Sequence, residues 1–86
     1  FFRLAATQGH ARAQYNLGLM HADGRGVPKD DVTAHMWFDL AASRATGEDQ
    51  NQAAENRDTV AERLSSNQRA EAQRLAREWN EAHPHD

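Results

Sequence analysis

The sequence contains two similar seven-residue segments, FFRLAAT at residues 1–7 and WFDLAAS at residues 37–43. Four of the seven aligned positions are identical, and the two segments are offset by 36 residues. A repeat of this length is typical of solenoids in which each unit is a pair of antiparallel helices. Because such a unit buries its apolar face only by stacking on its neighbours, the sequence predicts an all-α fold, an α/α solenoid of about five helices.

The composition argues against several kinds of site. The 86 residues include no cysteine, which excludes disulfide frameworks and thiolate metal sites. The net charge is −3 with both signs interspersed, so we expect no nucleic-acid partner. No apolar run reaches the ~18 residues of a membrane span, and we expect no membrane insertion. The five histidines lack the spacing of a helical zinc site, so neither a metal nor a cofactor is expected.

Glycine, proline and capping residues divide the chain into segments. Because it starts with apolar Phe1 and Phe2 rather than Met, we interpret it as a segment of a longer protein. Its degenerate last repeat and closing helix predict that this segment is the C-terminal end of a repeat array. The predicted segments are the second-helix tail of a preceding repeat (1–9), a complete repeat (10–45), one helix of a degenerate last repeat (46–64), a capping helix (65–82) and a tail (83–86). The first segment should pack on upstream repeats of the same chain, or form a dimer where they are missing.

The complete repeat is predicted to contain two helices joined by a turn at residues 23–29, where two glycines and Pro28 oppose helical geometry. Asp30 or Asp31 should cap the second helix. Gly18 lies inside the first helix at a cost of ~1 kcal/mol relative to Ala, which predicts that another helix approaches closely there. The apolar stripes of the two helices are Ala13, Leu17 and Met20, and then Thr33, Trp37, Leu40 and Ala41 with Met36 beside them.

The last two predicted helices each begin with the spacing of a capping box, Thr46 with Asp49 and Ser65 with Gln68. The first of these helices should extend to about Leu64. Its predicted inner face contains Ala53, Arg57, Val60, Ala61 and Leu64, with Arg57 lying along the edge. The stripe of the final helix is Ala72, Leu75, Ala76 and Trp79.

The complete repeat resembles the Sel-one-like repeat, a relative of the tetratricopeptide repeat. It has the family's order of a small residue, Leu-Gly, a Gly-x-Gly-Val loop, an acidic cap, and then Ala, Trp and Ala-Ala. The matching residues are Ala13, Leu17, Gly18, Gly24, Gly26, Val27, Asp30, Ala34, Trp37, Ala41 and Ala42. His21 stands where the family commonly has an aromatic residue, and residues 50–64 keep Asn56 at the place of Asn16 but lose the other motifs. The resemblance implies a scaffold for protein–protein contacts, often bacterial.

Four residues of the first helix in the complete repeat are candidates for partner binding. Arg12, Tyr15, Asn16 and Leu19 lie off its apolar stripe. In a tetratricopeptide-like stack, the first helix of each pair lines the concave side, where such proteins bind peptides or partner helices. We therefore expect a protein or peptide partner there. The alternative is that Tyr15 and Leu19 pack on the neighbouring repeat.

The expected function is a protein–protein interaction scaffold without catalysis of its own. The Gly24–Gly26 turn lacks the Lys-Ser/Thr of a phosphate-binding loop. The carboxylates Glu55, Asp58 and Glu62 are better explained as a solvated helix face than as an acid–base pair. Two alternatives remain open, an accessory or ligand-binding domain of a bacterial cell-envelope enzyme and a purely structural cap of a longer array. The sequence favours neither the bacterial cytoplasm nor the periplasm as its location.

Overall fold

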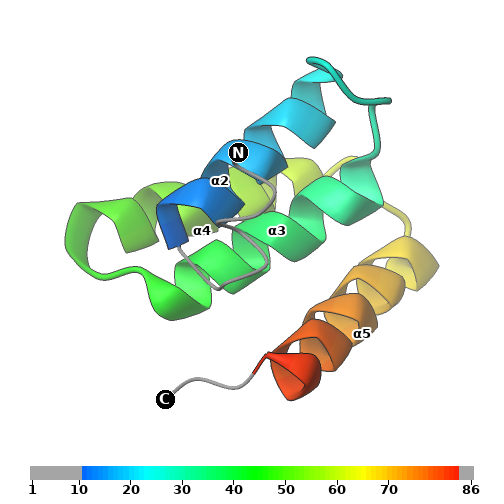
Figure 1. Cartoon of the computed structure of the whole chain (residues 1–86). Coiled ribbons are helices and arrows are strands. Elements are labelled where there is room, and N and C mark those ends of the chain that lie inside the picture. The colour runs from blue at the N-terminus through cyan, green and yellow to red at the C-terminus, as the bar shows by residue number, and fades with distance from the viewer. Residues whose placement is uncertain (1–10, 84–86) are drawn as a thin grey trace.

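The computed structural model describes residues 11–83, and this part of the chain is built from four α-helices without a strand. They are α2 (Ala11–Asp23), α3 (Asp31–Arg44), α4 (Gly47–Ala61) and α5 (Ser66–Ala82) (Figure 1). The all-α prediction is confirmed, and each helix begins and ends within three residues of its predicted position. The predicted first helix and its dimer contact, and residues 84–86 of the predicted tail, lie outside the described residues. No helix among residues 11–83 is long and apolar enough to cross a membrane.

The start of α3 is fixed by Asp30. Its carboxylate accepts hydrogen bonds from the Thr33 backbone N–H at 3.2 Å and from the Thr33 hydroxyl at 2.8 Å. Although partial burial acts to raise the pKa of Asp30, these hydrogen bonds hold that pKa below its ordinary value. Asp30 is therefore the N-cap, and Asp31 is the first helical residue.

The two predicted capping boxes have different outcomes. Ser65 accepts a hydrogen bond from the Gln68 N–H at 3.1 Å, and the Gln68 side chain accepts one from the Ser65 N–H at 2.8 Å, so this box is confirmed. Thr46 is the N-cap of α4, but its side chain makes no capping hydrogen bond. Gly47, which follows it, has a φ of +61°. We attribute the missing bond to this left-handed residue, which redirects the chain between Thr46 and the first turn.

Helix α3 is the centre of the fold. It packs against α2, α4 and α5, whereas α2 and α4 contact each other only weakly (Figure 1). Its buried residues are Ala34, His35, Met36, Trp37, Phe38, Leu40, Ala41 and Ala42. The predicted single stripe was therefore too narrow, and its member Thr33 is only half-buried. A helix that is covered from several directions buries residues well beyond one stripe.

The core lies on two sides of α3. One cluster joins α2, α3 and α5, and there the Trp79 ring meets the Trp37 ring edge-on with centroids 5.9 Å apart. Its buried members are Ala13, Leu17, Met36, Trp37, Leu40 and Ala76. A second cluster contains Ala34, Phe38, Val60 of α4 and Leu64, which follows α4, and residues of α2 also pack against it. A third, smaller cluster joins Ala41 and Ala42 of α3 to Ala53 of α4. Helices α4 and α5 thus cover different sides of α3.

Polar contacts secure the positions of α4 and α5 on α3. Arg57 of α4 is half-buried at the edge of the α3–α4 contact, with its Nη1 3.2 Å from Asp39 Oδ1, in agreement with the predicted edge position. At the end of α5, Arg44 of α3 donates to Asn80 Oδ1 at 2.9 Å and to the His83 carbonyl at 2.8 Å. The Arg44 guanidinium also lies 5.0 Å from the centre of the Trp79 ring. These contacts hold α5 against the outer end of α3.

Candidate functional site

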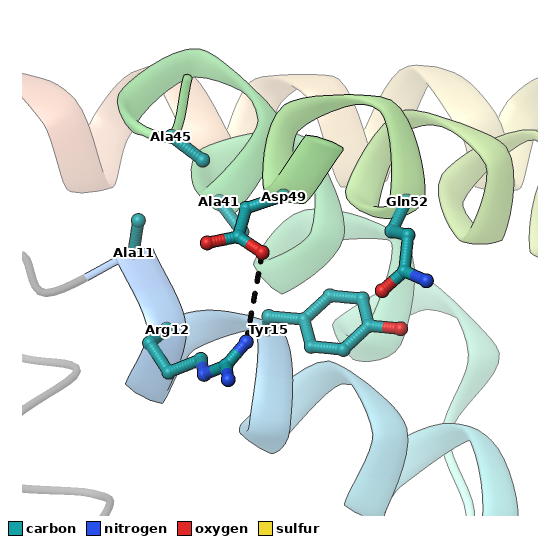
Figure 2. Close-up of a pocket in the computed structure, with 7 residues that line it drawn as sticks. All are labelled: Ala11, Arg12, Tyr15, Ala41, Ala45, Asp49 and Gln52. Carbon is teal, nitrogen blue, oxygen red and sulfur yellow. Dashed lines mark ion pairs between the residues drawn. The ribbon is translucent and has the colours of Figure 1, made fainter. Parts of the chain in front are cut away.

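A pocket lies where the N-terminal ends of α2 and α4 meet the C-terminal end of α3 (Figure 2). The residues of the described part of the chain that line it are Ala11, Arg12, Tyr15, Ala41, Ala45, Asp49 and Gln52. No residue of α5 belongs to this lining, because α5 covers a different side of α3. Within residues 11–83, α5 therefore does not cover the surface between α2 and α4 at this point.

The pocket exists because alanines stand where three helix ends converge. Ala11, Ala41 and Ala45 offer only methyl groups, so the space between the ends is not filled. The empty volume is about 280 Å³, including the part open to solvent. Because this figure includes open solvent, the enclosed space is far smaller than the about 300–1,000 Å³ of a typical small-molecule site, and the pocket is a shallow depression that takes at most one side chain of a larger partner.

Tyr15 forms the aromatic wall of the pocket. Its ring is half-buried and lies 5.7 Å from the Phe38 ring, tilted by 55°. Asn56 of α4 donates a hydrogen bond from Nδ2 to the Tyr15 hydroxyl at 2.8 Å. The same amide nitrogen lies 3.1 Å from the Gln52 carbonyl oxygen. Contacts at both ends of the ring fix its orientation, so the wall is already formed before any partner binds.

Two opposite charges stand at the pocket rim. Arg12 Nη1 of α2 lies 3.6 Å from Asp49 Oδ1 of α4, as the dashed line in Figure 2 marks. The two side chains are 75% and 65% exposed. Exposed ion pairs of this kind contribute little to stability, because water screens them and both side chains lose freedom. The pair can therefore open at low cost when another charged group approaches.

The structure separates the four residues predicted to bind a partner. Arg12 and Tyr15 line the pocket, whereas Asn16 and Leu19 do not. Leu19 packs against the α3–α4 cluster that contains Phe38, and Asn16 is half-buried on the same helix. Leu19 and Tyr15 thus pack against a cluster shared by their own repeat (Ala34, Phe38) and the following segment (Val60, Leu64), and packing on the neighbouring repeat alone stays a prediction.

Sequence reasoning did not identify the α4 residues of this site, Asp49, Gln52 and Asn56. The alignment of Asn56 with Asn16 could have identified them, because the same offset of 40 residues aligns Gln52 with Arg12. That register predicts that corresponding faces of the two first helices lie beside each other. Asp49 was interpreted as a capping residue, whereas in the structure its carboxylate forms an ion pair with Arg12.

Comparison with protein families agrees with this architecture. The Sel1 repeat model matches residues 1–10 and 11–45, together just over half of the 86 residues. The chain belongs to the Sel1 repeat family. Sel1 repeats form helical solenoids, and the family generally acts in protein–protein interactions. No solved structure matches the chain.

The pocket lies at the end of the matched Sel1 repeat. Of the seven lining residues that the structure describes, five come from the matched region 11–45, and Asp49 and Gln52 follow that region. The described lining of the pocket combines a guanidinium, a carboxylate, a phenol and an amide with three methyl groups. Among residues 11–83 there is no group of three or more His, Cys, Asp or Glu side chains that could hold a metal ion. These groups are suited to recognising a partner through hydrogen bonds and charge.

A buried histidine lies outside the pocket of the Sel1 repeat. His35 of α3 is 4% exposed, and its Nδ1 has no hydrogen-bond partner among the residues that the structure describes. Burial lowers the pKa of His35 below its ordinary value. The nearby carboxylates Asp39 and Asp58 act in the opposite direction, while the cations Arg57 and Arg69 add to the lowering. The fold therefore favours the neutral imidazole.

We expect this Sel1 repeat to lose stability as the pH falls below the ordinary histidine pKa of about 6.5. His35 accepts a proton more readily in the unfolded chain than in the folded one, so its stabilising contribution is complete above that pH and decreases below it. Thermal melts between about pH 7 and pH 5.5 avoid most carboxylate titration. The midpoint should fall less steeply in His35→Gln than in the wild type, and equal slopes would contradict this assignment.

Proposed function

We propose that this chain binds a partner protein along the surface between α2 and α4, with the pocket taking up one side chain of the partner. The observation that supports this most strongly is the pocket at the junction of α2, α3 and α4, which α5 does not cover. The general role of Sel1 repeats in protein–protein interactions supports the same proposal. The chain then contributes recognition and no catalysis of its own.

The arrangement of the helices supports this position for the partner. Helix α2 is the first helix of the α2–α3 pair, and we assign α4 to the equivalent place in the following, degenerate repeat, although α5 packs on α3 rather than on α4. The first helices of consecutive repeats line the concave surface of a solenoid. Arg12 and Tyr15 of α2 face Asp49 and Gln52 of α4 across the pocket (Figure 2). Asn16 extends the contact surface along α2, and Leu19 supports it from the core. A segment of the partner that crosses both helices would meet polar groups from each of them.

Site-specific photocrosslinking can identify the partner. A photoreactive residue at Gln52 lies on the pocket rim, whereas the same residue at Gln73 lies on the exposed face of α5 and serves as the matched control. We expect a discrete crosslinked protein from position 52 and none from position 73. A product of the same size and yield from both positions would contradict binding at the pocket.

Filling the pocket then tests whether the captured partner depends on it. Ala45 lines the pocket at the C-cap of α3, where its extended backbone accepts a larger residue. Ala45→Phe should weaken binding of the captured partner by about tenfold or more, as expected for blocking a central contact. Ala82→Phe, at the exposed end of α5, is the matched control and should leave the affinity unchanged. Equal affinities of the two variants would place the binding surface elsewhere.

A further inference from the structure

The protein's own arginine indicates which group the pocket rim accepts. The Arg12 guanidinium lies beside the Asp49 carboxylate at 3.6 Å, and both side chains are largely exposed (Figure 2). Arg12 is not held in place by burial, so another guanidinium can replace it beside Asp49 at low cost. The carboxylate at the pocket rim thus already pairs with a guanidinium of the same chain.

The pocket below this carboxylate fits the stem of a long cationic side chain. Alanine methyl groups and the Tyr15 ring provide an apolar surface against which methylene groups can pack. The Tyr15 ring also attracts a cation placed over its face. Gln52 stands on the same rim, and its side-chain oxygen can accept a hydrogen bond from a guanidinium. The lining therefore offers contacts to both the apolar stem and the charged end of an arginine.

The charge around the pocket also favours a positively charged partner. Helices α2 and α4 together carry five carboxylates and two guanidinium groups, and two of the carboxylates, Asp23 and Asp58, are paired with Arg25 and Arg57. Arg57 is also paired with Asp39 of α3. The carboxylates near the pocket are those of Glu48 and Asp49, in the first turn of α4. The N-terminal end of α4 would otherwise attract anions, but Glu48 and Asp49 in its first turn occupy that end with negative charge. An acidic partner would meet repulsion here, whereas a basic one is drawn to the surface.

We infer that the partner segment is basic, and that one of its arginine side chains enters the pocket and takes the place of Arg12 beside Asp49. This inference rests on the proposed function, since it names the chemistry of the segment bound between α2 and α4. It assigns opposite effects to the two members of one ion pair. Asp49 binds the arriving arginine, and Arg12 competes with it. A purely structural ion pair would not produce this opposition.

The test uses capped pentapeptides, Ala-Ala-Arg-Ala-Ala and its analogues with citrulline or glutamate at the centre, titrated into the whole chain and followed by two-dimensional amide NMR. Citrulline keeps the shape of arginine without its charge. We expect the arginine peptide to shift the amide signals of Ala45, Asp49 and Gln52 in a saturable manner. The citrulline and glutamate peptides should not do so. Equal shifts with citrulline, or stronger ones with glutamate, would overturn the inference.

Variants of the ion pair supply the decisive comparison. Asp49→Asn should weaken binding of the arginine peptide by about tenfold, while Asp49→Glu should retain it. Arg12→Gln should strengthen binding by about two- to fivefold, because it removes the competitor. Glu81→Gln, an exposed carboxylate on α5, is the control and should change nothing. The dispersion of the amide spectrum reports whether each variant is folded.

The two proposals fail in different ways. If the Gln52 crosslink captures a partner but the arginine peptide causes no shifts at the pocket, the basic segment is ruled out and the proposed binding surface stands. If Arg12→Gln weakens peptide binding instead of strengthening it, the competition between the two arginines is wrong. If neither the crosslink nor the peptide reports on the pocket, both proposals are overturned.

Discussion

Trp37→Ala is expected to leave the chain predominantly unfolded at room temperature. Trp37 is 8% exposed and lies in the cluster that joins α2, α3 and α5, where its ring also meets Trp79 edge-on. Truncating a buried tryptophan costs about 3–5 kcal/mol. Small domains are marginally stable, and at roughly 0.05 kcal/mol per residue a chain of this length has a total stability of about 4 kcal/mol, so the loss removes most or all of it. The far-UV circular dichroism at 222 nm should lose most of its helical signal relative to the wild type.

Two further variants make this expectation specific to the core contact. Trp37→Phe keeps an aromatic ring and should melt cooperatively at an intermediate temperature. Arg77→Ala changes an exposed residue of α5 and should melt close to the wild type. A cooperative melt of Trp37→Ala within a few degrees of the wild type would show that the three helices do not depend on this residue.

Local sequence rules predicted the helices and two of their caps well. Ser65 with Gln68, and Asp30 before the second helix of the repeat, act through backbone groups only three residues away, so spacing alone identifies them. The same spacing wrongly predicted a capping hydrogen bond at Thr46, and we attribute the missing bond to the left-handed conformation of Gly47, the next residue. The local backbone conformation, rather than residue type, decided that outcome.

Burial of α3 depended on contacts that periodicity does not contain. A hydrophobic period reveals that a helix has an apolar face, but not how many neighbours cover it. Phe38 and His35 lie off the predicted stripe and are nevertheless buried. They are covered because α4 and α5 pack on different sides of α3, which is a property of the tertiary arrangement.

Only part of the candidate site could be predicted from the sequence, because the rest also depends on the tertiary arrangement. Arg12 and Tyr15 were identified because they lie off the stripe of one helix. Asp49 and Gln52 belong to α4, and their approach to α2 depends on how α4 packs against α3. Only the weak register between Asn16 and Asn56 linked the two helices in the sequence.

Gly18→Ala should destabilise the chain even though alanine is the better helix former. A Cβ at Gly18 would lie 2.6 Å from Phe38 Cε1 and 2.7 Å from Cδ1, which confirms the predicted close approach of another helix. The Phe38 ring is 1% exposed and packs on Tyr15, so it has little room to move aside. Alanine gains about 1 kcal/mol in helix propensity. Overpacking costs typically 1–3 kcal/mol, and a contact this short lies at the upper end, for a net loss of about 1–2 kcal/mol.

A double-mutant cycle in urea separates this clash from the helix propensity. Phe38→Leu removes ring atoms that the new methyl group would meet, so Gly18→Ala should be less harmful, or even stabilising, in that background. Asn51→Ala, at an exposed position inside α4, reports the gain in propensity without a clash. Effects that add within about 0.5 kcal/mol would show that Gly18 and Phe38 do not interact.

A coupling between Gly18 and Phe38 would also affect binding, because the Phe38 ring supports the Tyr15 ring. Gly18→Ala should then also weaken binding at the pocket, although Gly18 does not line it.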